Sequence, residues 1–246
     1  MDRWFIGTSG YSYKHWRELF YPKGVAQKNW LAFYAERYNT VEINATFYRY
    51  FAQAVFARWR DATPEDFRFT LKGPRVITHV KRLHDTDDDL KRFLDSIQDL
   101  RSKLSLLLWQ FPPSFKYDTE DYKDKFVQFM EHLPYDIKHV VEFRHKSWFN
   151  DDTYALLNHH GIGFVINDSS RWAAAEVITG DVVYIRFHGP TRLYASSYDT
   201  EALMAWADKI KLWLKQYDVY VYFNNDFGGH AIRNSVELRD LLADQS

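Results

Sequence analysis

Apolar runs recur along the chain with the length and composition of short β-strands. They are rich in Val, Ile, Phe and Tyr, and each ends at polar sequence or at Gly or Pro. The pattern therefore predicts eight strands. They span residues 4–9, 41–46, 67–72, 104–111, 139–144, 163–168, 182–189 and 219–225.

Most of the intervals between these runs place apolar residues at i, i+3 and i+4, which is typical of amphipathic helices. This spacing predicts helices over residues 29–38, 86–100, 119–133 and 200–217, whereas the interval 169–181 has room for a short helix at most. Strands that alternate with helices predict a parallel sheet with right-handed crossovers. Eight such units in 246 residues predict an α/β protein with a single (β/α)8 TIM barrel.

No linker-like, low-complexity or charge-rich segment interrupts the series, so we expect one domain over residues 1–246. A doubly wound open sheet is the alternative architecture. It is less favoured because no G-x-G-x-x-G motif follows the first strand.

Five of the predicted strands alternate apolar and polar residues. In the fifth strand, Val141 and Phe143 share one face, and Glu142 and Arg144 share the other. We expect the apolar face to contact the helices and the polar face to line the barrel interior, with its polar groups near the carboxyl ends of the strands. Barrel enzymes place their active sites at that end. The alternative is an interior salt-bridge network that only fixes the strand register.

Composition narrows the class of protein. Hydrophobic residues make up 46% and aromatic residues 18% of the chain, which excludes a disordered protein. The formal charge of −1 gives no long-range attraction to nucleic acid or anionic membrane. Without cysteine there is no disulfide, thiolate catalysis or Cys-based metal site. Because no targeting pattern and no 18-residue apolar stretch occur, we expect a cytoplasmic protein with no membrane partner.

Basic residues at the strand ends form a candidate anion site. Its members are Lys72, Arg144, Arg186 and His188. Two arginines can each donate a pair of hydrogen bonds to carboxylate or phosphate oxygens, and a lysine adds a point charge. A Schiff-base role for Lys72 is the less favoured alternative.

Gly228 and Gly229 precede a predicted helix after the eighth strand. A Gly-rich turn that leads into a helix can present free backbone N–H groups to an anion, and barrels often bind phosphate near this loop. The alternative is that the two glycines only form a turn.

Acidic residues at the same end, together with His188, suggest proton transfer. The set is Glu42, Glu142, Asp168 and His188. Carboxylates beside arginines should stay ionised, and a histidine titrates near neutrality. Two glutamates in one cavity would also suit glycoside hydrolysis, which requires a defined separation of the carboxyl groups.

Metal binding has weak support in the sequence. Only His188 and His145 are expected at the carboxyl end of the barrel, whereas His159 and His160 precede a strand. The segment 84–89 lacks the Gly and the final Glu of a calcium loop. We therefore predict no cofactor, although an oxygen-rich divalent metal site would leave little trace in the sequence.

The loop 8–24 after the first strand is rich in aromatic residues. Exposed rings there could stack on a base or sugar. Alternatively, the rings bury one another in a satellite core. The rings belong to Tyr11, Tyr13, Trp16, Phe20 and Tyr21.

Several stretches together resemble the YecE-like proteins, a family of TIM barrels of unestablished function. They are IGTSGYSY with Trp16, NTVEINATFY, FTLKGP, WQFPPSF, VEFRHKSW, YIRFHG and YFNNDFGGHAIRN. The resemblance covers nearly the whole chain and implies the barrel and a pocket at its strand ends, but no reaction. The barrel is broadly similar to sugar isomerases and to three-metal apurinic-site endonucleases, whose metal ligands are here mostly replaced by Arg, Lys and Asn.

These observations favour an enzyme that acts on a small phosphorylated or carboxylated substrate. Arg144, Arg186 and Lys72 would hold the anion, and Glu142 and His188 would transfer protons. Further side chains would orient the substrate: Glu42, Asn44, Gln110, Asp168 and Asn224. The alternatives are a nucleic-acid-processing barrel and a non-catalytic ligand-binding barrel. The sequence gives no indication of the oligomeric state.

Overall fold

Eight parallel strands form a barrel in the computed structural model, which describes residues 4–119 and 121–243. The strands pair in the order β1-β8-β7-β6-β5-β4-β3-β2. Their bounds are β1 Trp4–Thr8, β2 Thr40–Ile43, β3 Arg68–Lys72, β4 Leu104–Gln110, β5 Lys138–Glu142, β6 Gly163–Asp168, β7 Val182–Phe187 and β8 Asp218–Phe223. The predicted (β/α)8 fold is confirmed, and each predicted strand overlaps an observed one.

The barrel closes between β1 and β2, where the ladder is reduced to one parallel bridge between Ser9 and Glu42. On its other side β1 pairs with β8 in full register, from Trp4 opposite Val219 to Thr8 opposite Phe223. Closure therefore brings Glu42 beside the end of the first strand.

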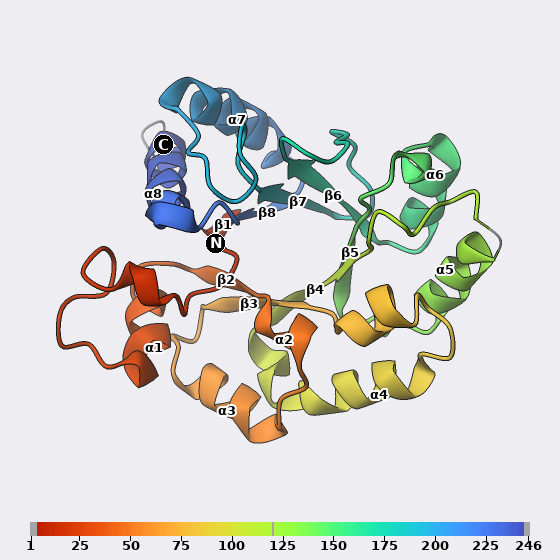
Figure 1. Ribbon diagram of the computed structural model, residues 1–246, viewed down its shortest axis with the longest axis horizontal. Helices are drawn as coiled ribbons and strands as arrows, with labels where there is room; N and C mark the ends of the chain where they lie inside the picture. The colour runs from red at the N-terminus through yellow and green to blue at the C-terminus, as the bar shows by residue number, and fades with distance from the viewer. Residues whose placement is uncertain (1–3, 120, 244–246) are drawn as a thin grey trace.

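The helices surround the strands (Figure 1). They are α1 Trp30–Ala35, α2 Ala45–Tyr48, α3 Gln53–Asp61, α4 Asp87–Ser96, α5 Tyr122–Glu131, α6 Asp151–His159, α7 Thr200–Trp213 and α8 His230–Ala243. The helices predicted over 29–38, 86–100, 119–133 and 200–217 correspond to α1, α4, α5 and α7. Between β6 and β7 the chain forms no helix, as the short interval 169–181 indicated.

Three helices, α2, α3 and α6, were not predicted from the sequence. α2 begins at Ala45, within the range 41–46 that was predicted as a strand. The other two bury few side chains: Phe56 in α3, and Thr153 and Leu157 in α6. A helix in which only one or two side chains are buried shows a weak amphipathic pattern, which is difficult to recognise in the sequence.

The predicted alternation of strand faces is confirmed. Val141 and Phe143 pack in the layer between strands and helices, as do Val183 and Ile185 of β7. The interior contains a separate cluster of buried side chains. It comprises Leu106, Leu108, Val140, Val165, Val182, Tyr184, Tyr220 and Tyr222, with Phe5 packed against it.

The side chains in the barrel interior change from apolar to charged toward the carboxyl ends of the strands. Val140 of β5 belongs to the interior apolar cluster, and Glu142, two residues further on, is fully buried and charged. Charged and amide side chains thus gather at the carboxyl ends of the strands. None of the described helices has the length and apolar content needed to cross a bilayer.

Candidate functional site at the barrel mouth

Arg186 links two buried glutamates across the barrel interior. Its Nε and Nη2 donate to the two carboxylate oxygens of Glu42 at 2.9 and 2.8 Å, and its Nη1 donates to Glu142. All three side chains are 0–1% exposed. β2, β5 and β7 are far apart in the sequence, so barrel closure alone brings these charges together.

Two further contacts complete this network. Tyr184 donates its hydroxyl to Glu42 Oε2 at 2.6 Å, and Arg144 donates Nε to Glu142 Oε1 at 2.9 Å. The guanidinium carbon of Arg144 lies 3.7 Å from the ring centroid of Trp172, which belongs to the β6–β7 loop. Arg144 is therefore held between a carboxylate and an aromatic face.

The field of this network determines the ionisation of its members. Burial alone would raise the pKa of Glu142, but Arg186, Arg144, His188 and Lys72 lower that pKa well below its ordinary value. Glu142 is thus an ion-paired carboxylate rather than a proton donor. Such a state does not suit the general acid of a glycosidase, whose pKa must be raised.

His188 lies fully buried beside this network. Burial, followed by the charge of Arg186, lowers the pKa of His188 well below its ordinary value, so the ring is neutral. Its Nδ1 lies 3.1 Å from Nδ2 of Asn224, while its Nε2 is 3.9 Å from Glu142 Oε1 and has no hydrogen-bond partner among the described residues. The Trp172 ring and the imidazole pack in a T-shaped arrangement, with centroids 5.2 Å apart.

Lys72 is a cation of the site that forms no ion pair within the described residues. Its Nζ donates to Gln110 Oε1 at 2.8 Å and lies 4.1 Å from the ring centroid of Phe47. Burial, together with the charges of Arg186 and Arg144, lowers the pKa of Lys72 to about 7. The amine is therefore partly neutral near physiological pH.

A cavity of about 710 Å³ opens above these groups, and we call it the mouth pocket. Its walls include the cationic side chains Lys72, Arg75, Arg144 and Arg186 together with one carboxylate, Asp226. The remaining lining residues are Tyr13, His15, Asn44, Phe47, Tyr48, His79, Gln110, Tyr194, Asn224 and Phe227. The pocket is thus predominantly basic, as the sequence predicted for this end of the barrel.

Several sequence-predicted residues meet in or beneath this pocket. Lys72, Arg144, Gln110, Asn44 and Asn224 line it. Arg186 also reaches the wall, but its charge is already compensated by two carboxylates. Glu42, Glu142 and His188 lie in the buried layer below.

Asp168 does not join this cluster. Its carboxylate accepts hydrogen bonds from the Tyr198 hydroxyl at 3.1 Å and from Trp206 Nε1 at 3.0 Å, so it lies in the layer between β6 and α7. The expected position in the pocket must be corrected. In β6, Asp168 lies on the same face as Phe164 and Ile166, which pack against the helices. This two-residue period could have shown from the sequence that Asp168 points away from the pocket.

The glycine pair after β8 forms a turn. Gly228 and Gly229 have φ angles of 71° and 74°, and Gly229 N–H donates to Asp226 O. A Cβ at Gly229 would lie 2.0 Å from a methyl carbon of Leu19. Neither glycine lines the mouth pocket. This arrangement fits the interpretation as a packed turn better than that as an anion site.

The aromatic loop after β1 is folded against the barrel. Trp16 and Tyr21 are at most 1% exposed, and Tyr21 stacks on Trp30 with centroids 4.4 Å apart. The interpretation as a satellite core therefore holds for the centre of the loop. Tyr13 differs, because it reaches the wall of the mouth pocket.

The distribution of histidines and acids gives no candidate metal centre in the described part of the chain. No three His, Asp or Glu side chains are grouped there in a way that could hold a metal ion. Nδ1 of His145 caps the short 3-10 helix Lys146–Trp148 by accepting from Ser147 N–H. The expectation that no cofactor is required stays a prediction.

Sequence reasoning missed several residues of the site. Arg75 and His79 lie in the segment that follows β3, and their position after a strand end was the signal that could have found them. Burial, with the nearby charge of Lys72, lowers the pKa of His79 to about 4. Tyr194 and Trp172 lie in loops with no such local signal.

Comparisons with known proteins agree with this architecture. The family model described as "Protein of unknown function DUF72" matches residues 5–246. UPF0759 protein YunF of Bacillus subtilis is 26% identical over 97% of this chain and 94% of its own, and UPF0759 protein YecE of Escherichia coli K12 is 26% identical over 89% and 85%.

Solved structures give the same picture. The crystal structure of a DUF72 family protein from Thermotoga maritima MSB8 superposes with a TM-score of 0.88 and 30% identity, covering 97% of this chain and 98% of that one. The match extends over the whole barrel rather than one of its parts. The chain therefore belongs to the DUF72 family, to which the YecE-like resemblance of its motifs pointed.

Proposed function

We propose that this barrel is an enzyme that acts on a small phosphorylated or carboxylated substrate bound in the mouth pocket. The observation that carries the proposal is the environment of Lys72. Its amine is buried at the pocket wall without a carboxylate partner among the described residues, and Arg144 and Arg75 line the same cavity. A dianion bound there would supply the missing negative charge.

Arg144 is the side chain best placed to hold the anion. Within the described residues only its Nε donates a hydrogen bond, which leaves the Nη1 and Nη2 groups for a ligand. Its stacking on Trp172 fixes the plane of the guanidinium. Preorganisation of this kind favours bidentate recognition of a carboxylate or phosphate group.

We assign proton transfer to Lys72, because a group with a pKa near 7 can both accept and donate a proton at neutral pH. Gln110 Oε1 orients the amine toward the pocket. The proton-transfer roles expected for Glu142 and His188 stay predictions. In this arrangement the charge of Glu142 contributes to the electrostatic field around Lys72.

Pyridoxal 5′-phosphate, an anionic aldehyde, tests this assignment. The neutral amine would add to the aldehyde and release water, and borohydride would reduce the resulting imine to a stable secondary amine. We expect mass spectrometry to find the main adduct on Lys72, with less adduct when inorganic phosphate competes or when Arg144→Met is used. Lys81, whose side chain is 39% exposed, is the internal control, because a hydrogen bond to Asp89 raises its pKa.

Labelling of Lys72 no faster than Lys81, or labelling that phosphate does not slow, would contradict the proposed anion site. A separate measurement addresses catalysis: heat flow is followed after addition of a panel of phosphate and carboxylate metabolites. Saturable binding with no turnover across the panel would indicate a ligand-binding barrel instead.

A further inference from the structure

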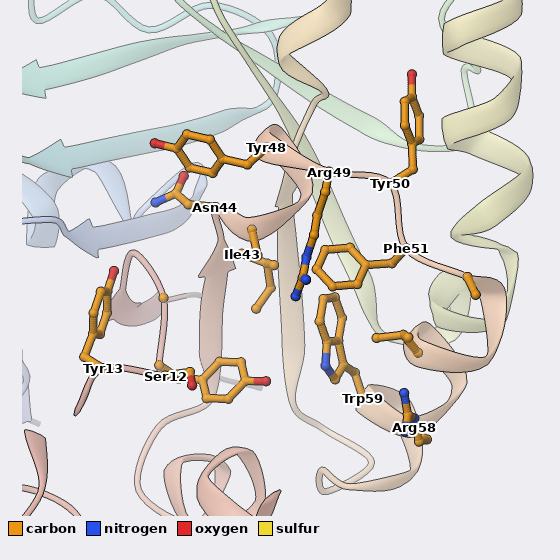
Figure 2. Close-up of a pocket in the computed structure, with 15 residues that line it drawn as sticks. Ser12, Tyr13, Ile43, Asn44, Tyr48, Arg49, Tyr50, Phe51, Arg58 and Trp59 are labelled. Atoms are coloured by element: carbon orange, nitrogen blue, oxygen red, sulfur yellow. The ribbon is translucent and has the colours of Figure 1, made fainter. Parts of the chain in front are cut away.

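A second cavity of about 680 Å³ adjoins the mouth pocket, and we call it the aromatic cleft (Figure 2). Rings from three segments line it: the loop after β1, the end of α2, and the segment that includes α3. Tyr13, Asn44 and Tyr48 line both cavities. A ligand that passes these three residues would therefore reach the cleft and the mouth pocket at once.

One wall of the cleft is formed by flat groups in contact with one another, with the Phe51 and Trp59 rings tilted by 60°. The guanidinium carbon of Arg49 lies 4.4 Å from the ring centroid of Phe51, which lies 5.3 Å from that of Trp59. Figure 2 shows these three side chains packed against one another beside Ile43. Such a surface suits a planar ring, which gains from stacking on both aromatic and guanidinium faces.

The cleft also carries uncompensated positive charge. Among the described residues, no ion pair or side-chain hydrogen bond engages the guanidinium groups of Arg49 and Arg58, both of which line it. This charge complements a ligand that is anionic as well as aromatic.

Two features at the shared wall point toward a ligand. Oδ1 of Asn44 is buried and has no hydrogen-bond partner within the described part of the chain. A buried acceptor of this kind gains stability from a donor such as an amine or a hydroxyl of a ligand. Tyr48, which lines the same wall, is 76% exposed although it carries a large aromatic ring.

We propose that the aromatic cleft binds the base of a nucleoside monophosphate whose phosphate lies in the mouth pocket. This inference rests on the proposed function and names its substrate class. The base stacks against the flat groups of the cleft, and the ribose spans the shared wall near Asn44. A sugar phosphate without a base would fill only the mouth pocket and leave the cleft empty.

Calorimetric titration with AMP, ribose 5-phosphate and adenosine tests this inference. We expect wild-type protein to bind AMP about tenfold more tightly than ribose 5-phosphate, because stacking of one base contributes about that factor. Arg49→Ala and Phe51→Ala, which change residues that line the cleft but not the mouth pocket, should reduce the affinity for AMP to that for ribose 5-phosphate and leave the latter unchanged. Tyr135→Ala is the control, since Tyr135 is 89% exposed and precedes β5 at the opposite end of the barrel.

The outcomes separate the two proposals. Equal affinities for AMP and ribose 5-phosphate in the wild type would overturn the base site and leave the anion pocket standing. Adenosine binding that depends on Arg49, without any binding of ribose 5-phosphate, would overturn the anion pocket and retain the base site. Absence of binding by all three compounds would overturn both.

Discussion

Arg186 occupies a position in which neither solvent nor a ligand is needed to balance its charge. Two carboxylates contact its guanidinium, one of them through two hydrogen bonds. Removing three charges from water carries a large desolvation cost, which the close pairing offsets. Arg186 therefore acts first on the structure of the site, and Arg144 and Lys72 remain to contact a ligand.

Replacement of Arg186 tests this structural role. Arg186→Met would leave Glu42 and Glu142 buried without their shared partner, so we expect a loss of about 3–5 kcal/mol in the free energy of unfolding. Urea denaturation measures the change. The exposed Arg171→Met serves as the matched control, and a variant Arg186→Met as stable as that control would show that the network contributes little.

Asp168 shows how one side chain can belong to a strand end without belonging to the site. Its carboxylate bonds Tyr198 and Trp206 in the helix layer. Successive residues of a barrel strand point alternately into the barrel and toward the helices, so two residues at the same strand end can lie in different layers. Chemical type alone placed Asp168 with the acids of the pocket, and its parity places it outside.

At the scale of elements, the β6–β7 connection covers the buried layer beneath the mouth pocket, whereas α2 contributes Phe47 and Tyr48 to the pocket wall. The chain from residue 169 to 181 forms a loop rather than a helix. This loop carries Trp172 to the guanidinium of Arg144 and the ring of His188. The short interval thus provides a cover for the buried layer of the site.

The β1–β2 seam depends on a residue without a side chain. A Cβ at Gly7 would lie 2.3 Å from the backbone oxygen of Thr40. Backbone atoms on neighbouring elements cannot rotate away, so the two segments would have to separate. Because Glu42 lies on β2, this close approach also fixes the position of one partner of Arg186.

Substitution of Gly7 tests the seam. We expect Gly7→Ala to lower the free energy of unfolding by about 1–3 kcal/mol or more through overpacking. Gly24→Ala is the comparison, because a Cβ there meets no atom within 4 Å and its cost is limited to the positive φ of 95°. Equal costs for the two substitutions, measured by chemical denaturation, would contradict tight packing at the seam.

At the scale of the whole molecule, folding removes several imidazoles from water in their neutral form. Burial is the largest cause that lowers the pKa of His139 to about 4. Its Nδ1 accepts from Trp109 Nε1 and its Nε2 contacts Pro134 O, so the neutral ring is fully bonded. The unfolded chain binds a proton at this residue near its ordinary pKa of 6.5, which the folded barrel does not.

This difference predicts a pH dependence of stability. Because the unfolded state binds more protons between pH values of about 6.5 and 4, the free energy of unfolding should fall as pH falls through that window. His139→Gln should reduce the slope by up to about 1.4 kcal/mol per pH unit. Chemical denaturation at a series of pH values measures this slope, and His159→Gln, at an exposed position, is the control. A slope in His139→Gln equal to that of the wild type would contradict a buried neutral ring at His139.

The sequence by itself determined the eight strands, the alternation of their faces and the end of the barrel that carries the polar groups. These features follow from local properties, because strand propensity and the two-residue period of side chains depend on consecutive residues. The same local pattern was sufficient to place Lys72, Arg144, Asn44 and Asn224 together in one pocket, whereas Gln110 was named only from its position at the end of a strand.

Only the tertiary structure decided how these groups are used. Arg186 meets Glu42 and Glu142 because closure of the barrel brings β2, β5 and β7 together across its axis, and no local pattern encodes that meeting. Trp172 reaches Arg144 through a loop whose path depends on long-range packing. Closure of the barrel therefore decides which charges pair. It also leaves Lys72 as a buried cation that has no ion pair among the described residues.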